Sequence, residues 1–116
     1  MQDNISPLAK LEAALSHSAG VYVNASVDAE SYLAGLADDI RDSMCDPFPV
    51  TATVTEPGFP DRVMGSTINA VCLAHRGGYW LAYDGARDQF LCFWGSSADN
   101  LAAPGIFGSP LYCWSA

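Results

Sequence analysis

The chain has 116 residues, half of them hydrophobic, and carries 13 acidic and 5 basic side chains for a formal net charge of −8. This length suits one domain that buries roughly two thirds of its unfolded surface, so we expect a single compact domain over residues 1–116. The acidic balance argues against direct binding of nucleic acid or of an anionic membrane surface. Charged residues near the start interrupt the apolar stretch that a signal peptide needs, and no apolar run approaches the ~20 residues of a membrane span, so we expect a cytoplasmic protein.

Two helices are predicted in the first part of the chain, where apolar side chains recur at helical spacing. The first runs from about Ser6 to Ser18, with Ser6 as its N-cap. Residues 21–27 match either a short strand or an extended connection. The second helix runs from about Ala29 to Met44. Its buried stripe comprises Leu33, Leu36, Ala37, Ile40 and Met44.

Strands are predicted after Pro47, where the hydrophobic period changes from that of a helix to that of a strand. Apolar residues alternate with threonines from Val50 to Thr55, which is the pattern of a half-buried strand. Three further strands are predicted, at about 66–75, 79–83 and 89–94.

Short turns join these strands into a meander. Arg76-Gly77-Gly78 is predicted to form a tight hairpin, because glycine reaches the positive φ that such turns require, and residues 84–88 form the next connection. Residues 95–110 are predicted to be a loop, and residues 111–114 a final short strand or a docked chain end. The predicted fold class is α+β, with two N-terminal helices packed on an antiparallel β-meander of four to five strands.

Both faces of the predicted meander are apolar. Pairing across the turns puts Trp80 and Ala82 on one face. Phe90, Cys92 and Trp94 are expected on that face too. A sheet with one solvent-exposed face alternates apolar and polar side chains, and this one does not. Either the helices and the chain end cover both faces, or an aromatic patch stays exposed as an interaction site.

The pattern of cysteines and histidines predicts no catalytic, metal or cofactor site. The four cysteines form no C-x-x-C pair and three lie in apolar segments, which favours reduced core thiols; two disulfides in an exported protein are the alternative. Cys72 and His75 are three residues apart on a strand and point to opposite faces. Cys92 shares a predicted face with His75, but no neighbouring feature activates its thiol. We therefore expect no enzyme, no metal and no cofactor.

Acidic side chains are concentrated in and just after the second helix. Residues 28–46 contain six of them and a single basic side chain, Arg41. Such a cluster keeps a small protein soluble, or it complements a basic partner and accelerates association with it.

Three features of residues 66–116 indicate a class of protein: the aromatic-aliphatic hairpins (YWLAYDGARDQFLCFWG), the Gly/Pro loop after them and the Trp-containing end (GSPLYCWSA). In these features the chain resembles the small bacterial immunity proteins that accompany polymorphic, contact-dependent or type VI secreted toxins. The resemblance implies a short, acidic, cytosolic protein without catalytic residues, which covers a toxin's active site or blocks its motion.

The working hypothesis is therefore an inhibitor that binds and neutralises a cognate bacterial toxin or effector with a basic surface. A nuclease is one such effector, because its substrate groove must itself be basic. The expected partner-binding residues are Asp38, Asp39, Asp42 and Asp46 near the second helix and Trp80, Asp84, Arg87 and Asp88 at the meander edge.

Three alternatives stay open at this point. A phage-type inhibitor or nucleic-acid mimic, such as an anti-CRISPR protein, has the same size and charge. A small enzyme or ligand-binding domain would use a pocket near Cys92 and His75, with Tyr83 at its mouth. A homodimer would pair the apolar sheet faces of two copies.

Overall fold

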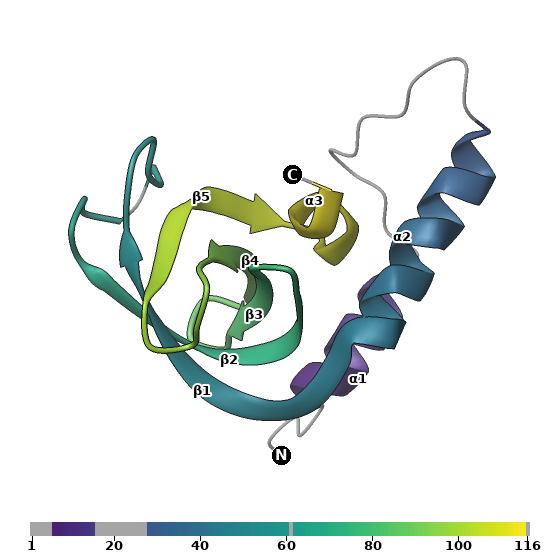
Figure 1. The fold of residues 1–116 in the computed structure, drawn as a ribbon, viewed down its shortest axis with the longest axis horizontal. Coiled ribbons are helices and arrows are strands. Elements are labelled where there is room, and N and C mark those ends of the chain that lie inside the picture. The colour runs from purple at the N-terminus through teal and green to yellow at the C-terminus, as the bar shows by residue number, and fades with distance from the viewer. Residues whose placement is uncertain (1–5, 16–27, 61, 116) are drawn as a thin grey trace.

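A computed structural model describes residues 6–15, 28–60 and 62–115 of the chain. The predicted α+β class is confirmed, with helices placed against a five-stranded meander (Figure 1). The segment 21–27 and the end of the first predicted helix lie outside the described residues. In chain order the elements are α1 (Pro7–Ala14), α2 (Ala29–Ser43), β1 (Met44–Val54), β2 (Thr67–Arg76), β3 (Tyr79–Asp84), β4 (Gln89–Trp94), β5 (Leu101–Gly108) and α3 (Pro110–Ser115).

Local sequence signals set most of these boundaries. The Ser6 hydroxyl accepts a hydrogen bond from the Ala9 N–H (3.2 Å) and so caps α1, as predicted. The Asp28 carboxylate caps α2 in the same way through the Ser31 N–H (3.1 Å). The three strands β2, β3 and β4 begin and end within one residue of their predicted limits.

The five strands close into a barrel in the order β1-β2-β3-β4-β5 (Figure 1). Strands that are consecutive in the chain pair antiparallel, and β5 returns beside β1 in a parallel pairing. The last pairing has to be parallel, because the four reversals of the meander leave β1 and β5 running in the same direction. Closure leaves neither the first nor the last strand with a fully unpaired edge.

The segment predicted as a loop, residues 95–110, contains β5, so that part of the prediction was wrong. Strand β5 is held by partners that are distant in sequence: the Thr55 N–H donates to the Ala103 carbonyl (2.9 Å) and the Gly58 N–H to the Pro104 carbonyl (3.0 Å). Gly105 has a φ of +115°, and a Cβ there would lie 2.2 Å from the Gly58 carbonyl oxygen. Only glycine allows the two backbones to approach this closely.

The chain end forms the short helix α3 and not a strand. Its start is held by Ser109, whose hydroxyl accepts from the Tyr112 N–H (3.3 Å) and whose carbonyl accepts from the Cys113 N–H (3.0 Å). The expectation of a docked end is confirmed, because Leu111 and Trp114 are buried.

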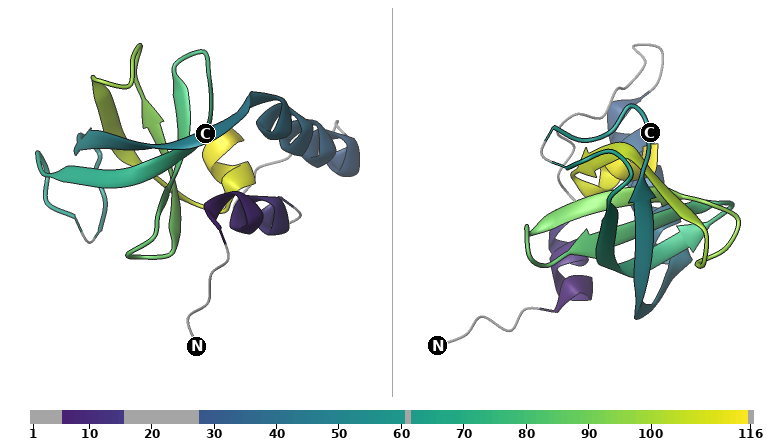
Figure 2. Two further views of the ribbon diagram at one scale, coloured as in Figure 1. Left: turned by 90° about the horizontal axis from the view of Figure 1, so that it is seen from below. Right: turned by 90° about the vertical axis from the view of Figure 1, so that its left-hand side faces the viewer.

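Two apolar clusters cover the two faces of the meander. All three helices lie on one side of the barrel, where they cover the outer face (Figure 2). The cluster inside the barrel consists of Val50, Ala52, Val54, Phe59, Ile68, Ala70, Cys72, Trp80, Ala82, Leu91, Phe93, Leu101 and Ala103. The cluster between barrel and helices consists of Leu11, Leu15, Ala37, Ile40, Leu73, Ala74, Leu81, Tyr83, Cys92, Leu111, Cys113 and Trp114.

The register between β3 and β4 differs by one residue from the predicted one. Trp80 pairs with Phe93 and Leu81 with Cys92, because the connecting turn contains four residues, 85–88, rather than five. A shift of one residue exchanges the two faces of a strand. Trp80 therefore shares the barrel interior with Phe93, and Cys92 points outward under the helices.

Candidate binding surface

The acidic residues predicted on the second helix lie at the surface. Asp38, with 72% of its side chain exposed, pairs with Arg41 (3.3 Å), and Asp39 pairs with Arg76 (2.7 Å). Asp42 is also exposed, as is Asp46 near the start of strand β1. Exposed ion pairs of this kind contribute only ~0–1 kcal/mol each. The carboxylates of Asp38 and Asp39 can therefore exchange their cation for one on another protein at little cost.

Two of the predicted edge residues, Trp80 and Asp84, are buried. Trp80 is 9% exposed, its indole N–H donates to the Gly95 carbonyl (2.9 Å), and its ring stacks on His75 (centroids 4.5 Å apart, 16° between planes). The Asp84 carboxylate pairs with the buried guanidinium of Arg62 (2.9 Å). These two side chains stabilise the fold and present no surface to a partner.

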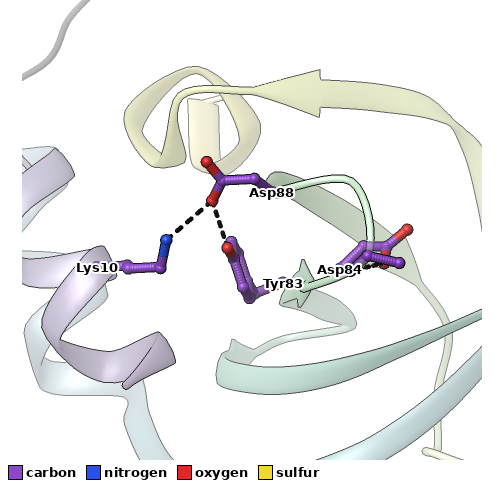
Figure 3. A network of polar contacts seen from close by, with 5 residues as sticks. Lys10, Tyr83, Asp84 and Asp88 are labelled. Carbon is purple, nitrogen blue, oxygen red and sulfur yellow. Dashed lines mark hydrogen bonds and ion pairs between the residues drawn. The ribbon is translucent and has the colours of Figure 1, made fainter. Parts of the chain in front are cut away.

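Asp88 lies in the β3–β4 turn with a φ of +50° and connects that turn to α1 (Figure 3). Its carboxylate accepts a hydrogen bond from the Tyr83 hydroxyl and another from the Lys10 ammonium (3.2 Å). The Tyr83 hydrogen bond lowers the pKa of Asp88, whereas the hydrogen bond to Asp88 raises the pKa of Lys10. Asp88 therefore has a structural role, and Arg87 is exposed beside it.

Among the residues that the structure describes, the exposed aromatic ones are Tyr79 and Trp94, which form a cross-strand pair on β3 and β4. They are 39% and 42% exposed, and their rings stack with centroids 6.3 Å apart and planes 19° apart. They lie on the outer face of the barrel, in the same alternation as Leu81 and Cys92. The partner-binding residues expected from the sequence include neither Tyr79 nor Trp94, because their pairing follows only from a turn of four residues at 85–88.

An open cleft of about 350 Å³ lies between α2 and the β2–β3 turn. Asp39 and Leu36 line it from α2, Tyr79 lines it from β3, and Trp114 lines it from α3. The cleft therefore joins the acidic side of α2 to the exposed aromatic pair. Through Asp39 and Tyr79, charge and aromatic surface meet at one place on the molecule.

The thiols and the histidine considered for catalysis do not form a site. Cys72 and Cys92 are fully buried, and burial raises the pKa of Cys72 to about 12 and that of Cys92 to about 11. Burial also raises the pKa of Cys113 and of Cys45. A second cleft, of about 480 Å³, is lined by Pro49–Thr51 together with Ala98 and Asp99. Cys92, His75 and Tyr83 line neither of the two clefts.

Comparison with known proteins identified no relative: no protein-family description matches the chain, and searches of curated proteins and of solved structures found no similar one. Within the described ranges 6–15, 28–60 and 62–115, the helices are too short or too polar to cross a bilayer. In the same ranges, His, Cys, Asp and Glu side chains do not gather in groups of three or more that could hold a metal ion.

Proposed function

We propose that this protein is a stoichiometric inhibitor that binds and neutralises a cognate toxin or effector through a basic surface of that effector, in the manner of a bacterial immunity protein. The observation that carries the proposal is the cleft at which Asp39 of the acidic helix meets the exposed Tyr79–Trp94 pair.

The two parts of this surface have separate tasks in binding. The carboxylates of Asp38, Asp39 and Asp42 attract a cationic partner and raise the association rate. Charge alone gives little affinity, because exposed ion pairs contribute ~0–1 kcal/mol each. Tight inhibition also needs desolvated central contacts, and partly exposed aromatic residues are the side chains most often found in that position. Tyr79 and Trp94 supply them here.

The state of the thiols supports inhibition by binding rather than catalysis. A catalytic cysteine needs a lowered pKa and access to its substrate, whereas Cys72 and Cys92 are buried and have raised pKa values. The partner we propose is a cytoplasmic effector such as a nuclease, whose substrate groove carries the cations that the acidic side of α2 would cover.

The first experiment measures binding to the product of the neighbouring reading frame. The double variant Asp38→Lys/Asp42→Lys should slow association by about tenfold or more and weaken its salt dependence, because it reverses the charge that steers the partner. The matched control is Glu56→Lys/Asp99→Lys, which makes the same change in net charge at exposed positions outside the α2 surface.

A second arm of the experiment replaces one member of the aromatic pair, Tyr79. Tyr79→Ala should leave the association rate nearly unchanged and speed dissociation by about 30-fold, the effect of losing a central contact. Equal association rates for the two charge-reversal variants, or unchanged dissociation for Tyr79→Ala, would contradict this surface as the binding site.

A further inference from the structure

We propose that the cleft between α2 and the β2–β3 turn is a receptor for one arginine side chain of the partner protein. This inference rests on the proposed function, since it specifies which chemical group of the basic partner the surface recognises. It adds a defined pocket and a defined ligand, the guanidinium group, to an interface otherwise described only by charge.

The walls of the cleft have the composition that a guanidinium requires. Asp39 supplies a carboxylate, Tyr79 an aromatic ring, and Leu36 an apolar surface for the side-chain stem. A planar guanidinium donates to a carboxylate and stacks on an aromatic face, whereas an ammonium does only the first well. A cavity of about 150 Å³ is enough to hold a benzene ring, so the cleft of about 350 Å³ has room for the head and stem of an arginine.

Gly77 of the β2–β3 turn forms another part of the cleft lining. Gly77 has a φ of +57°, as the tight hairpin requires, and a Cβ at this position would meet no atom within 4 Å. The turn geometry therefore selects a residue without a side chain at this part of the lining, and the space beside its backbone is open.

The protein already holds two guanidinium groups against carboxylates, and one of them also lies over an aromatic ring. Arg76 also lines the cleft, and its guanidinium donates to the Asp39 carboxylate at 2.7 Å. Elsewhere, the Arg62 guanidinium lies between the Asp84 carboxylate (2.9 Å) and the face of the Phe59 ring (5.4 Å). A carboxylate beside an aromatic ring is thus an arrangement that holds arginine within this fold.

The Arg76–Asp39 pair can be exchanged for a pair with an incoming arginine. Both side chains are about half exposed, at 53% and 49%, so Arg76 can turn to solvent when another guanidinium reaches Asp39. The neighbouring Asp38 and Asp42 keep the potential around the cleft attractive for a second cation. A second copy of this chain is disfavoured as the occupant, because two molecules of net charge −8 repel each other.

The test uses capped arginine (N-acetyl-arginine amide) as the probe and follows its titration by two-dimensional NMR of the intact protein. We expect saturable shifts of the backbone amides of Gly77 and Tyr79 and of the indole N–H of Trp114, with an affinity in the millimolar range. Capped lysine should bind at least about fivefold more weakly, because it lacks the stacking plane.

Two variants and one control locate the site. Asp39→Asn should weaken binding of capped arginine by about tenfold, since it removes the charge-assisted hydrogen bond, and Tyr79→Leu should weaken it while keeping the wall apolar. Asp99→Asn is the matched control, an exposed acidic residue outside the cleft, and should bind capped arginine as the unmodified protein does.

The possible results separate this inference from the proposed function. Shifts that do not saturate, equal binding to Asp39→Asn, or equal binding of capped lysine would overturn the arginine receptor, even if the effector still depends on Asp38 and Asp42. Conversely, specific binding of capped arginine by a protein that binds no neighbouring gene product would support the pocket and contradict the inhibitor function.

Discussion

Neighbouring residues on one strand have different tasks in this molecule. On β3, Tyr79 lies on the outer surface beside Trp94, whereas Trp80 fills the barrel interior and stacks on His75. The alternation of a strand produces this division, because consecutive side chains point to opposite faces. Parity decides which face of the strand an aromatic side chain takes, and the cover of the helices decides whether that side chain is buried, since Tyr83 shares the face of Tyr79 and is only 5% exposed.

The prediction at the scale of the residue concerns Gly105. Replacement by alanine should destabilise the protein by more than about 1 kcal/mol, because the φ of +115° disfavours any side chain and the Cβ would collide with the Gly58 carbonyl. Urea unfolding of the variant measures the change. The matched control is Gly35→Ala inside α2, where a Cβ meets no atom within 4 Å and alanine should stabilise by about 0.5–1 kcal/mol. A Gly105→Ala variant as stable as the unmodified chain would contradict the close approach of β5.

At the scale of the element, α1 is attached to the barrel by apolar contacts and by one polar network. Leu11 is fully buried in the outer cluster, and Lys10 reaches the turn at Asp88, with its ammonium 5.7 Å from the centre of the Tyr83 ring (Figure 3). Burial raises the pKa of Tyr83, so its hydroxyl stays protonated and continues to donate to Asp88. Any pH dependence of this contact around neutrality therefore comes from Asp88 and Lys10, whose pKa values are shifted in opposite directions.

The prediction for this element is that the network stabilises the fold at neutral pH and is lost at both extremes. The pKa of Asp88 is lowered in the folded state, so its contribution is complete above the unfolded value of 3.8 and disappears as the pH falls through the lower folded value. The pKa of Lys10 is raised, so its contribution is complete below 10.5 and disappears as the pH rises through the higher folded value.

Unfolding free energies of the unmodified protein and of Asp88→Asn, measured across pH, test this. The difference between the two should be constant from about pH 5 to pH 9 and shrink toward zero in acid. Tyr83→Phe serves as the control, since it removes the hydroxyl that donates to Asp88 and should raise the pKa of that carboxyl in an NMR titration. A stability difference that does not change in acid would show that Asp88 is not held by this network.

At the scale of the whole molecule, the barrel and the helices together bury three of the four thiols. Cys72 lies inside the barrel, and Cys92 and Cys113 lie between the barrel and the helices. Cys45 is partly exposed, and its thiol also has a raised pKa. A thiol reacts through its thiolate and needs access to the reagent, so we expect the closed fold to slow the reaction of these thiols.

We therefore predict that a disulfide reagent such as Ellman's modifies the folded protein slowly at pH 8. Cys72, Cys92 and Cys113 should react only at the rate of unfolding, and Cys45 should react more slowly than a free thiol. The Cys45→Ser variant should lose the earliest phase and no other. A thiol of the folded protein that reacts faster than free cysteine would contradict this arrangement and favour an enzyme.

The local signals in the sequence determined the elements that depend on neighbouring residues. Ser6 marked the start of the first helix, Gly77-Gly78 marked the hairpin, and the acidic residues of α2 were correctly expected to lie at the surface. Each of these features arises within a few positions along the chain. A cap satisfies N–H groups two or three residues away, and a positive φ favours glycine at the position that adopts it.

Only the tertiary structure decided the position of β5, the register of β4 and the composition of the candidate surface. Strand β5 has no strand-like alternation and is held between β4 on one side and residues 52–58, more than forty positions earlier in the chain, on the other. The length of the 85–88 turn decides whether Trp94 shares a face of the sheet with Tyr79 or with Trp80, and the packing of α2 against the barrel brings Asp39 and Tyr79 into one cleft. These features depend on contacts between distant segments, and such contacts leave no periodic pattern in the sequence of either segment.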